Sequence, residues 1–548
     1  MKKDFTPEQE LLFLALGGSG EIGMNVNLYG CEGKWLMVDL GMTFGANEYP
    51  GTELVFADLD FIEERLDDLV GIVLTHGHED HIGAVPYFAA DLGVPLYATP
   101  FTAELVLRKL EEAGIAKDVE LNIIDDLEPF ALGPFEMSYV PLAHSIAEGN
   151  ALLIDTPHGR IFHTGDWKLD EEPIIGEPTT QEELCAMGDE GIDFLVCDST
   201  NAFNPTASGS EGAVYRGLLE EVQRHGGKRV LVTTFASNVA RLETLGEVAK
   251  ATGRQICVAG RSLERIIEVG QSTGYLQNFP DTVDFDTANG LPRGELLIVA
   301  TGGQGEPRAA LARIAENNHQ LELVSGDVVL FSSRQIPGNE ISIGRVQNQL
   351  AARGIVMVTD RQSHIHVSGH PGRPELEALY SWLRPTTLIP VHGEIRHMAE
   401  QARLGKKCGI PQQVVQKNGD LVRLAPGKPG KIAEVRSGRL VLDGDIIVPS
   451  DGDAVTMRRR IARDGIVIVA LDHKLQPMVE GVGLPLDEDY PAFVAEATQD
   501  IVTAIQRLKG PARKDPADIH EAARLAARRA AQRWCGKRPQ VRVLMARS

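Results

Sequence analysis

Three histidines and an aspartate lie within six residues of one another, directly after a strand-like apolar stretch. The segment GIVLTHGHEDHIGAVPYF ends its apolar run at Thr75, and His76, His78, Asp80 and His81 follow. Buried polar side chains each need a partner, so this density is hard to reconcile with a packed core. Imidazole nitrogen and carboxylate oxygen are ligands that zinc and manganese accept. The spacing therefore predicts a metal site where this strand ends.

Further ligands are expected at the ends of other strands, because one metal needs about four ligands and a two-metal site roughly six or seven. His144 follows the strand-like SYVPLA, Asp166 follows RIFHTG, and His392 follows TTLIPV. Two other histidines fit this role less well. His158 stands in the turn TPHGR, where we expect it in solvent. His163 lies within a strand. Because side chains alternate along a strand, we expect His163 to point away from the side to which Asp166 points.

The elements that position these side chains fall into blocks of different pattern. Residues 11–200 alternate short apolar runs with turns rich in glycine and aspartate, which is typical of a strand-rich α/β domain. Residues 228–334 instead repeat strand, turn and helix, as in KRVLVTTF followed by SNVARLETLGEVAKA, and this alternation predicts a parallel sheet. The earlier pattern returns after residue 360. We therefore expect the parallel block to be a separate domain inserted into the first.

The chain differs again from about residue 450, and its charge is segregated. The whole sequence has 54 Lys and Arg against 77 Asp and Glu, a net charge of −23. Residues 507–548 hold twelve Lys or Arg and three Asp or Glu, a local excess of +9 that leaves the first 506 residues near −32. The stretch EAARLAARRAAQRW is interpreted as an amphipathic helix that faces solvent or another subunit, with an RNA-contacting surface as the alternative.

Composition bounds the class of protein. The 548 residues are 43% hydrophobic and 24% charged, as in globular proteins with large cores, and the acidic net charge argues against non-specific coating of nucleic acid. Six scattered cysteines without a CxxC pair favour neither a disulfide framework nor a thiolate zinc site. Acidic residues interrupt the N-terminal stretch, and no window is long and apolar enough to span a membrane. We expect a cytoplasmic protein.

The segment GGSGEIG imitates a dinucleotide-binding loop. Gly18, Gly20 and Gly23 have the GxGxxG spacing, and Asp39 lies 21 residues beyond Gly18. That motif requires a helix to open at its third glycine. Here MNVNLYGCEGK follows, which alternates apolar and polar residues and is broken by glycines. We expect a hairpin at this position and no nicotinamide site.

The histidine motif and the order of the later residues resemble the metallo-β-lactamase fold. HGHEDH matches the HxHxDH signature of that fold, with Asp39 after a strand before it and three candidate ligands after it. The resemblance implies that Asp166 bridges two metals and that Asp39 orients the histidine loop from behind. It assigns three further ligands to each ion: His76, His78 and His144 to one, and Asp80, His81 and His392 to the other.

Two more features resemble the nuclease branch of this fold, in which a β-CASP domain splits the lactamase domain. Asp198 ends the strand-like DFLVC before the inserted block, and His370 in HIHVSGH follows that block, so Asp198, His370 and His392 match the three motifs of the branch. The phrases TGDWKLD, CDSTNA, TTFASNVARLE, GRSLERI, TGGQGEPRAALARIA, SSRQIPGNE and PVHGEIRH resemble the ribonuclease J family over residues 10–440. The tail resembles that family more weakly.

The resemblance implies an α/β protein, a metallo-β-lactamase αββα sandwich interrupted by a β-CASP parallel-sheet domain, with a small α+β domain at the C-terminus. The expected boundaries are 1–206 and 351–449 for the two parts of the lactamase domain, 207–350 for the β-CASP domain and 450–548 for the C-terminal domain. A homodimer or homotetramer that forms through the C-terminal domain is implied as well.

The implied activity is 5′-to-3′ hydrolysis of single-stranded RNA from a 5′-monophosphate end, with internal cleavage, in RNA decay and in rRNA and mRNA processing. Two divalent ions, Zn²⁺ or alternatively Mn²⁺ or Mg²⁺, would supply hydroxide near neutral pH and counter the charge on the phosphodiester. Asp80, His370 and Asp198 would be catalytic. His370 would stabilise the pentacovalent phosphorus or protonate the leaving 3′-oxygen, and Asp198 would orient His370 or His392. A turn or helix-cap role is the alternative for Asp198.

A second group of residues resembles a pocket for the 5′-phosphate. Backbone N–H groups at helix starts favour phosphate, and arginine can bind it with two hydrogen bonds. For Ser237 and Ser368, the alternative to phosphate binding is that each serine only caps a helix or turn. TGGQGEP is interpreted as a tight turn. The residues implied for phosphate binding are Ser237 and Asn238 at one strand-to-helix turn, Arg261 at another, and His366, Ser368 and Gly369 in a glycine turn.

Three other functions compete with this prediction. A DNA nuclease of the same branch would share every motif, and matched RNA and DNA oligonucleotides separate the two. A small-molecule metallo-hydrolase needs neither the inserted block nor HIHVSGH. A non-catalytic RNA-binding scaffold would not need the full set of ligands.

Overall fold

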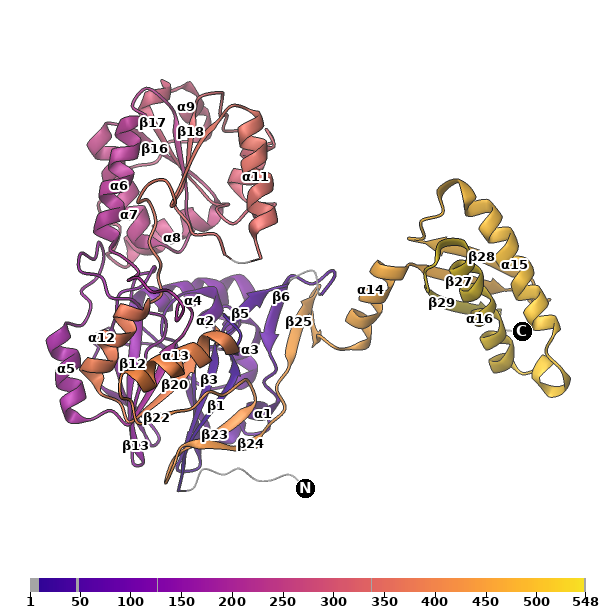
Figure 1. Cartoon of the computed structure of the whole chain (residues 1–548), viewed down its shortest axis with the longest axis horizontal. Helices are drawn as coiled ribbons and strands as arrows, with labels where there is room; N and C mark the ends of the chain where they lie inside the picture. The colour runs from indigo at the N-terminus through magenta and orange to yellow at the C-terminus, as the bar shows by residue number, and fades with distance from the viewer. Residues whose placement is uncertain (1–8, 46–48, 126, 337, 547–548) are drawn as a thin grey trace. The chain divides into compact units, whose positions relative to one another are not determined.

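The computed structural model describes residues 9–45, 49–125, 127–336 and 338–546 (Figure 1). It divides into two compact units. One holds the chain up to Thr43 together with Phe56–Ser437, and the other holds Phe44–Val55 and the chain from Gly438 onward. The domain boundaries expected from the sequence stay predictions, and each unit is described by itself.

Two sheets face each other in the first unit. The first has the strand order β24-β23-β1-β3-β4-β7-β8-β9 and the second the order β10-β11-β12-β13-β14-β20-β22. The strands of the first sheet are β1 Leu11–Gly17, β3 Val26–Cys31, β4 Lys34–Val38, β7 Leu69–Val73, β8 Leu96–Ala98, β9 Leu121–Ile123, β23 Asp420–Ala425 and β24 Gly430–Glu434. Those of the second are β10 Phe130–Leu132, β11 Phe135–Pro141, β12 Asn150–Thr156, β13 Gly159–His163, β14 Phe194–Asp198, β20 Thr387–Val391 and β22 Gln412–Gln413.

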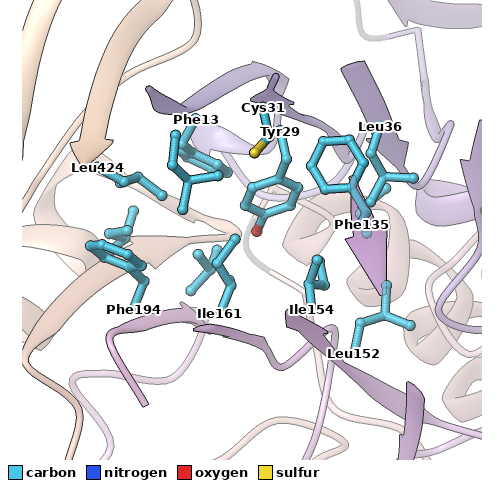
Figure 2. Close-up of a cluster of buried hydrophobic side chains, with 14 of the residues drawn as sticks. Phe13, Tyr29, Cys31, Leu36, Phe135, Leu152, Ile154, Ile161, Phe194 and Leu424 are labelled. Atoms are coloured by element: carbon cyan, nitrogen blue, oxygen red, sulfur yellow. The ribbon is translucent and has the colours of Figure 1, made fainter. Parts of the chain in front are cut away.

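The apolar core lies between these sheets (Figure 2). Phe13 and Tyr29 from the first sheet pack with Phe135, Ile154 and Ile161 from the second, and all five are fully buried. β1 is buried on both faces, which explains why its sequence LLFLAL is continuously apolar. Helices cover the outer faces, α3 (Val85–Leu92) and α4 (Pro100–Ala113) on the first sheet, and α5 (Gln181–Glu190), α12 (Arg373–Leu383) and α13 (Ile395–Lys407) on the second. The predicted αββα sandwich is confirmed.

Polar residues that lie far apart in the sequence follow neighbouring parallel strands. β4 and β7 are parallel neighbours in the first sheet, as are β13, β14 and β20 in the second. Asp39 follows β4, His76 comes shortly after β7, Asp166 shortly after β13, and His392 directly after β20, while Asp198 is the last residue of β14. Because the carboxyl ends of parallel strands meet at one edge of a sheet, the fold gathers these residues at one rim.

The GGSGEIG segment turns back as a hairpin and does not open a helix. β1 pairs antiparallel with β3, which confirms the hairpin expected from the sequence. Within the turn, the short strand β2 (Ser19–Gly20) pairs with β21 (Gly393–Glu394), next to His392. The glycines therefore let the chain pass close beside the polar rim.

A five-stranded sheet of its own is inserted between β14 and β20. Its order is β16-β17-β15-β18-β19, and every pair is parallel, which confirms the predicted parallel block. The strands are β15 Val230–Thr233, β16 Gln255–Ala259, β17 Leu296–Ala300, β18 Val328–Phe331 and β19 Val356–Thr359. The helices that surround them are α6 Glu211–Arg224, α7 Val239–Thr252, α8 Arg261–Ser272, α9 Phe285–Gly290, α10 Ala310–Ala315 and α11 Glu340–Ala352.

The second unit holds a small α+β domain, as expected. Its sheet has the order β28-β27-β29, with β27 Ile466–Leu471, β28 Pro477–Val482 and β29 Gln540–Met545. The helices α15 (Tyr490–Gln506) and α16 (Pro516–Cys535) pack together over one face of this sheet. Five alanines of α16, from Ala523 to Ala531, are buried there, while Arg533 on the outer side pairs with Glu496 at 2.7 Å. The Arg-rich stretch is thus an amphipathic helix.

The shorter elements complete both units. They are β5 Met42–Phe44, β6 Leu54–Ala57, α1 Asp60–Glu63, α2 Glu79–Ile82, β25 Arg439–Asp443, β26 Ile446–Pro449 and α14 Asp453–Asp464. Within the described ranges, the chain holds no helix with the length and apolar character needed to cross a bilayer.

Candidate metal centre

The histidine motif forms a tight loop between β7 and the short helix α2. His76 and His78 lie in the loop, and His78 is the N-cap residue of α2, so Asp80 and His81 project from the first turn of that helix. Gly77 allows the tight turn, because a Cβ at this position would come within 2.6 Å of a methyl carbon of Leu105. Four potential ligands therefore leave one short segment in nearby directions.

Three histidines and an aspartate surround a first point. Nδ1 of His78 lies 3.1 Å from Nε2 of His76 and 3.1 Å from Nε2 of His144. Oδ2 of Asp166 lies 3.9 Å from Nε2 of His76 and 3.8 Å from Nε2 of His144. One ligand atom from each of the four residues falls within 4.8 Å of the others.

A second group of four shares Asp166 with the first. Nε2 of His81 lies 3.3 Å from Oδ2 of Asp166, and Nδ1 of His392 lies 3.1 Å from Oδ1 of the same carboxylate. Nε2 of His392 contacts Oδ2 of Asp80 at 3.1 Å. The structure thus brings together all seven residues expected as ligands, in two groups that meet at Asp166.

The donor atoms of these groups fit divalent cations. Burial holds the pKa of His76 and of His144 well below the ordinary value and lowers that of His78 to about 4, so the three rings are neutral at pH 7. Oδ1 of Asp166 is buried and accepts no hydrogen bond from any described residue. Neutral imidazole nitrogens that converge beside a buried carboxylate are donors that divalent cations accept, so the cluster is compatible with metal binding.

Groups behind the ligands fix their orientation. Oδ2 of Asp39 lies 2.6 Å from Nδ1 of His81 and accepts the Thr75 hydroxyl at 2.9 Å, while its Oδ1 accepts the Thr75 amide at 2.8 Å. Nδ1 of His144 lies 2.7 Å from the carbonyl oxygen of Gly369. Sequence reasoning singled out Asp39 but missed Thr75 as a partner, because a threonine at a strand end carries no signal of its own.

His370 and Asp198 form a pair beside the two groups. Nδ1 of His370 lies 2.7 Å from Oδ2 of Asp198, and the other oxygen of Asp198 is 3.5 Å from Nδ1 of His392. Oδ1 of Asp198 also accepts the amide of Thr200 at 2.8 Å, so the carboxylate makes both the histidine contact and the turn contact that the sequence left open. Although burial opposes protonation of His370, Asp198 and then Asp166 raise its pKa above the ordinary value.

Asn201 is a site residue that sequence reasoning missed. Its side-chain amide donates to the Ser368 hydroxyl at 2.8 Å and to the carbonyl oxygen of His370 at 3.1 Å. Asn201 thereby ties the loop after β14 to the turn that carries His370. Its place in CDSTNA, three residues after Asp198, is the only sequence signal for this role.

The residues expected to bind phosphate fall into separate places. Ser368 accepts the amide of His370 at 3.1 Å, and the side chain of Asn238 caps α7 by accepting the amide of Arg241 at 2.9 Å. Ser237 is half-buried in the turn before α7, and His366 and Gly369 belong to the same turn as Ser368. Arg261 lines a cavity whose wall contains none of the other five.

The two histidines that the sequence analysis set apart from the ligands lie outside the cluster. His158 contacts Glu32 at 2.9 Å in a half-exposed turn. His163 is buried, and its Nδ1 lies 2.7 Å from the hydroxyl of Tyr29 between the two sheets. The alternation of β13 therefore separates His163 from Asp166, as the sequence predicts.

Four family models match consecutive parts of the chain. The metallo-β-lactamase superfamily matches residues 22–183, and the ribonuclease J β-CASP domain matches residues 227–350. The Zn-dependent metallo-hydrolase RNA specificity domain matches residues 355–415, and the ribonuclease J C-terminal domain matches residues 453–548. Together with the two-sheet fold and its histidine cluster, these matches define a metal-dependent hydrolase of the metallo-β-lactamase superfamily.

Curated relatives narrow this class to one family. A ribonuclease J of Sinorhizobium meliloti is 39% identical over 99% of this chain and 98% of its own length. A ribonuclease J of Mycolicibacterium smegmatis is 36% identical over 95% of this chain and 94% of its own. The chain belongs to the ribonuclease J family and is a hydrolytic ribonuclease. A crystal structure of a protein of unknown function from Enterococcus faecalis V583 shares the fold, with a TM-score of 0.55 and 17% identity over 76% of this chain and all of that one.

Proposed function

We propose that the chain degrades single-stranded RNA in the 5′-to-3′ direction from 5′-monophosphate ends and also cuts internally, in RNA decay and in rRNA and mRNA processing. The observation that carries this proposal is the placement of the His370–Asp198 pair beside two ligand groups that share Asp166. Such a centre can hold a phosphodiester with a proton donor next to it.

His76, His78 and His144 would hold one divalent ion, and Asp80, His81 and His392 the other, with Asp166 shared by both. When bound, the ions lower the pKa of a water and neutralise charge on the phosphate. Zn²⁺ is the preferred candidate because imidazole dominates the donor set, with Mn²⁺ and Mg²⁺ as alternatives. Asp39 would keep His81 in the tautomer that presents Nε2.

His370 is proposed as the proton donor to the leaving 3′-oxygen. Its Nδ1 is engaged by Asp198, which leaves Nε2 to address the substrate. A neighbouring carboxylate favours the imidazolium form, the form that can give up a proton. The turn of His366, Ser368 and Gly369, together with Ser237 in the turn before α7, is proposed to receive the 5′-phosphate.

The test is product mapping on matched oligonucleotides. RNA and DNA of one sequence, each with a 5′-monophosphate or a 5′-triphosphate, are incubated with the chelator-treated protein to which Zn²⁺, Mn²⁺ or Mg²⁺ is returned. Mononucleotides released from 5′-monophosphorylated RNA are the expected result, and no turnover is expected without metal. Equal turnover of DNA would favour the DNA nuclease, and turnover in excess chelator would contradict the metal mechanism.

We also propose that two copies of the chain associate through the open face of the β28-β27-β29 sheet. α15 and α16 cover the other face, whereas Met478 is 74% exposed and Leu544 is 60% exposed. Ile468 pairs with Glu480 on one side and with Arg542 on the other, so an acid and a base flank an apolar centre. A two-fold axis along the strands places Glu480 of one copy against Arg542 of its partner, twice. This self-complementary pattern favours a second copy of the chain as the occupant.

A further inference from the structure

A cavity of about 830 Å³ opens at the carboxyl edge of the parallel sheet in the β-CASP domain. Its wall is built from the turns that follow β15, β16 and β17. In open parallel sheets, ligands bind in crevices outside the carboxyl ends of the strands. None of the residues proposed as metal ligands lines this cavity, so it is distinct from the metal centre.

The cavity wall is basic. Arg265 forms an ion pair with Glu112, which belongs to α4. Arg261 is exposed and forms no hydrogen bond or ion pair with the part of the chain that the structure describes. Its guanidinium is therefore available for a ligand, and arginine matches phosphate with two parallel hydrogen bonds. The charged residues that line the cavity are Arg261, Arg265, Arg308 and Arg313, with Glu264 and Glu306.

Two polar features point into the same space. α8 begins at the wall, where Gly260, Arg261 and Ser262 all line the cavity, and the first N–H groups of a helix have no acceptor within it. Thr234 also lines the cavity, yet it is only 2% exposed, and its hydroxyl has no hydrogen-bond partner among the described residues. An unpaired buried hydroxyl is unfavourable, and a ligand oxygen in the cavity would satisfy it.

Aromatic rings line the wall as well. Phe285 and His319 meet edge to face, with their ring centroids 5.1 Å apart, and Phe235 is half-buried in the turn after β15. Nucleobases stack on such rings without sequence preference, because every base has a π-face. A basic wall, an uncapped helix start, an unpaired hydroxyl and aromatic rings together suit one ligand chemistry, a phosphate joined to a planar base.

We propose that this cavity binds a nucleoside 5′-monophosphate unit, with the phosphate at Arg261 and the start of α8 and the base against Phe285 and His319. The unit can come from the RNA strand or from free mononucleotide, which have the same chemistry. Only the first source rests on the ribonuclease function proposed above.

Binding is measured on the full chain in EDTA, so that cleavage does not interfere. The probes are a 3′-fluorescein-labelled, 5′-phosphorylated U10 followed by anisotropy, and UMP followed by calorimetry. Arg261→Ala is expected to raise the Kd of the affected probe about tenfold, since a charge-assisted contact is lost. Phe285→Leu, which keeps an apolar side chain, is expected to raise it about fivefold. Arg345→Ala is the control, because it removes an equally exposed arginine from α11, which does not line the cavity.

The outcomes distinguish RNA from free mononucleotide as the ligand, and they distinguish a failure of the cavity proposal from a failure of the ribonuclease proposal. Weaker U10 binding in Arg261→Ala assigns the cavity to the RNA strand, and weaker UMP binding alone assigns it to free nucleotide. Unchanged Kd values for both probes overturn the cavity site. RNA turnover by the metal-loaded wild-type protein is recorded in parallel, so a failure of the ribonuclease proposal is seen there and leaves the UMP result interpretable.

Discussion

At the scale of single residues, the balance between burial and nearby carboxylates decides which form each imidazole takes. The rings of His76, His78 and His144 are held neutral by desolvation, whereas the pKa of His392 is raised because nearby carboxylates, Asp166 first, outweigh the effect of burial. A bound cation would replace the proton on such a ring, since metal ligation requires neutral imidazole. The cluster is therefore compatible with cation binding.

His78→Ala is expected to abolish cleavage while the fold is retained. His78 contacts both His76 and His144, so its loss opens the first ligand group. We expect turnover to fall by more than about a hundredfold, because even outer partners of a metal contribute 10–100-fold. Turnover, metal content and circular dichroism are measured together. His158→Ala, in a turn away from the cluster, is the matched control, and retained turnover in metal-free His78→Ala would contradict the mechanism.

Ser368→Ala is expected to weaken the preference for a 5′-monophosphate over a 5′-triphosphate. The Ser368 hydroxyl accepts from Asn201 and from the His370 amide, so its loss loosens the turn proposed to hold the phosphate. We expect the ratio of kcat/KM for the two 5′ ends to fall about tenfold, the effect of one strong hydrogen bond. An unchanged ratio would place the phosphate pocket elsewhere.

At this scale, a site residue could be predicted from the sequence only where its neighbours in the chain form a recognisable motif with it. HGHEDH places four candidate metal ligands within six residues, and this density by itself indicates a metal site. Asn201 and Thr75 act through partners that are distant in sequence or through their backbone, and a single asparagine or threonine has no such signature. Arg261 stands at a strand-to-helix turn, and the sequence could not show that it lines a cavity to which Ser368 does not belong.

At the scale of elements, a buried ion pair holds the stem of the His370 turn. Arg241 of α7 is fully buried and contacts both carboxylate oxygens of Glu211 in α6, at 3.0 and 3.2 Å. The same guanidinium donates to the carbonyl oxygen of Ile365, at 3.2 Å, which lies within HIHVSGH and precedes its glycine turn. The helices of the β-CASP domain thereby fix the loop that returns to the metal centre.

Glu211→Gln is expected to destabilise the protein by about 3–5 kcal/mol, because it leaves the Arg241 charge buried without its partner. Urea unfolding followed by circular dichroism measures the change. The double variant Glu211→Gln/Arg241→Met removes both charges and is expected to recover much of the loss. A single variant as stable as the wild type would mean that this pair does not hold the two helices together.

Element types were predictable where one pattern dominates. The repeat of strand and helix over 228–334 predicts the parallel sheet, and the apolar run LLFLAL predicts a strand. The contact between Glu211 and Arg241 was not predictable, since both lie on helices where a charged residue ordinarily faces solvent. The buried position of each follows only from how α6 and α7 pack.

At the scale of the whole molecule, charge is distributed by unit. The basic tail lies in the C-terminal domain, and part of it is neutralised there, as Arg533 pairs with Glu496 and Arg524 with Glu521. These pairs favour the interpretation of α16 as a structural amphipathic helix over a broad RNA-contacting surface. On the open face of the sheet in this domain, Met478 and Leu544 are exposed.

A charge exchange tests whether that face joins two copies. Glu480→Arg and Arg542→Glu each place like charges together twice across a two-fold axis, so each variant alone is expected to form smaller assemblies than the wild type in sedimentation experiments. Mixed in equal amounts, the two variants restore both pairs of opposite charge, and the larger assembly is expected to return. Arg507→Glu makes the same change of charge at the end of α15, away from the open face, and is expected to have no effect. A wild-type monomer, or single variants that assemble normally, would contradict association of two copies through the open face. Recovery on mixing is specific to this proposal, because no other occupant predicts it.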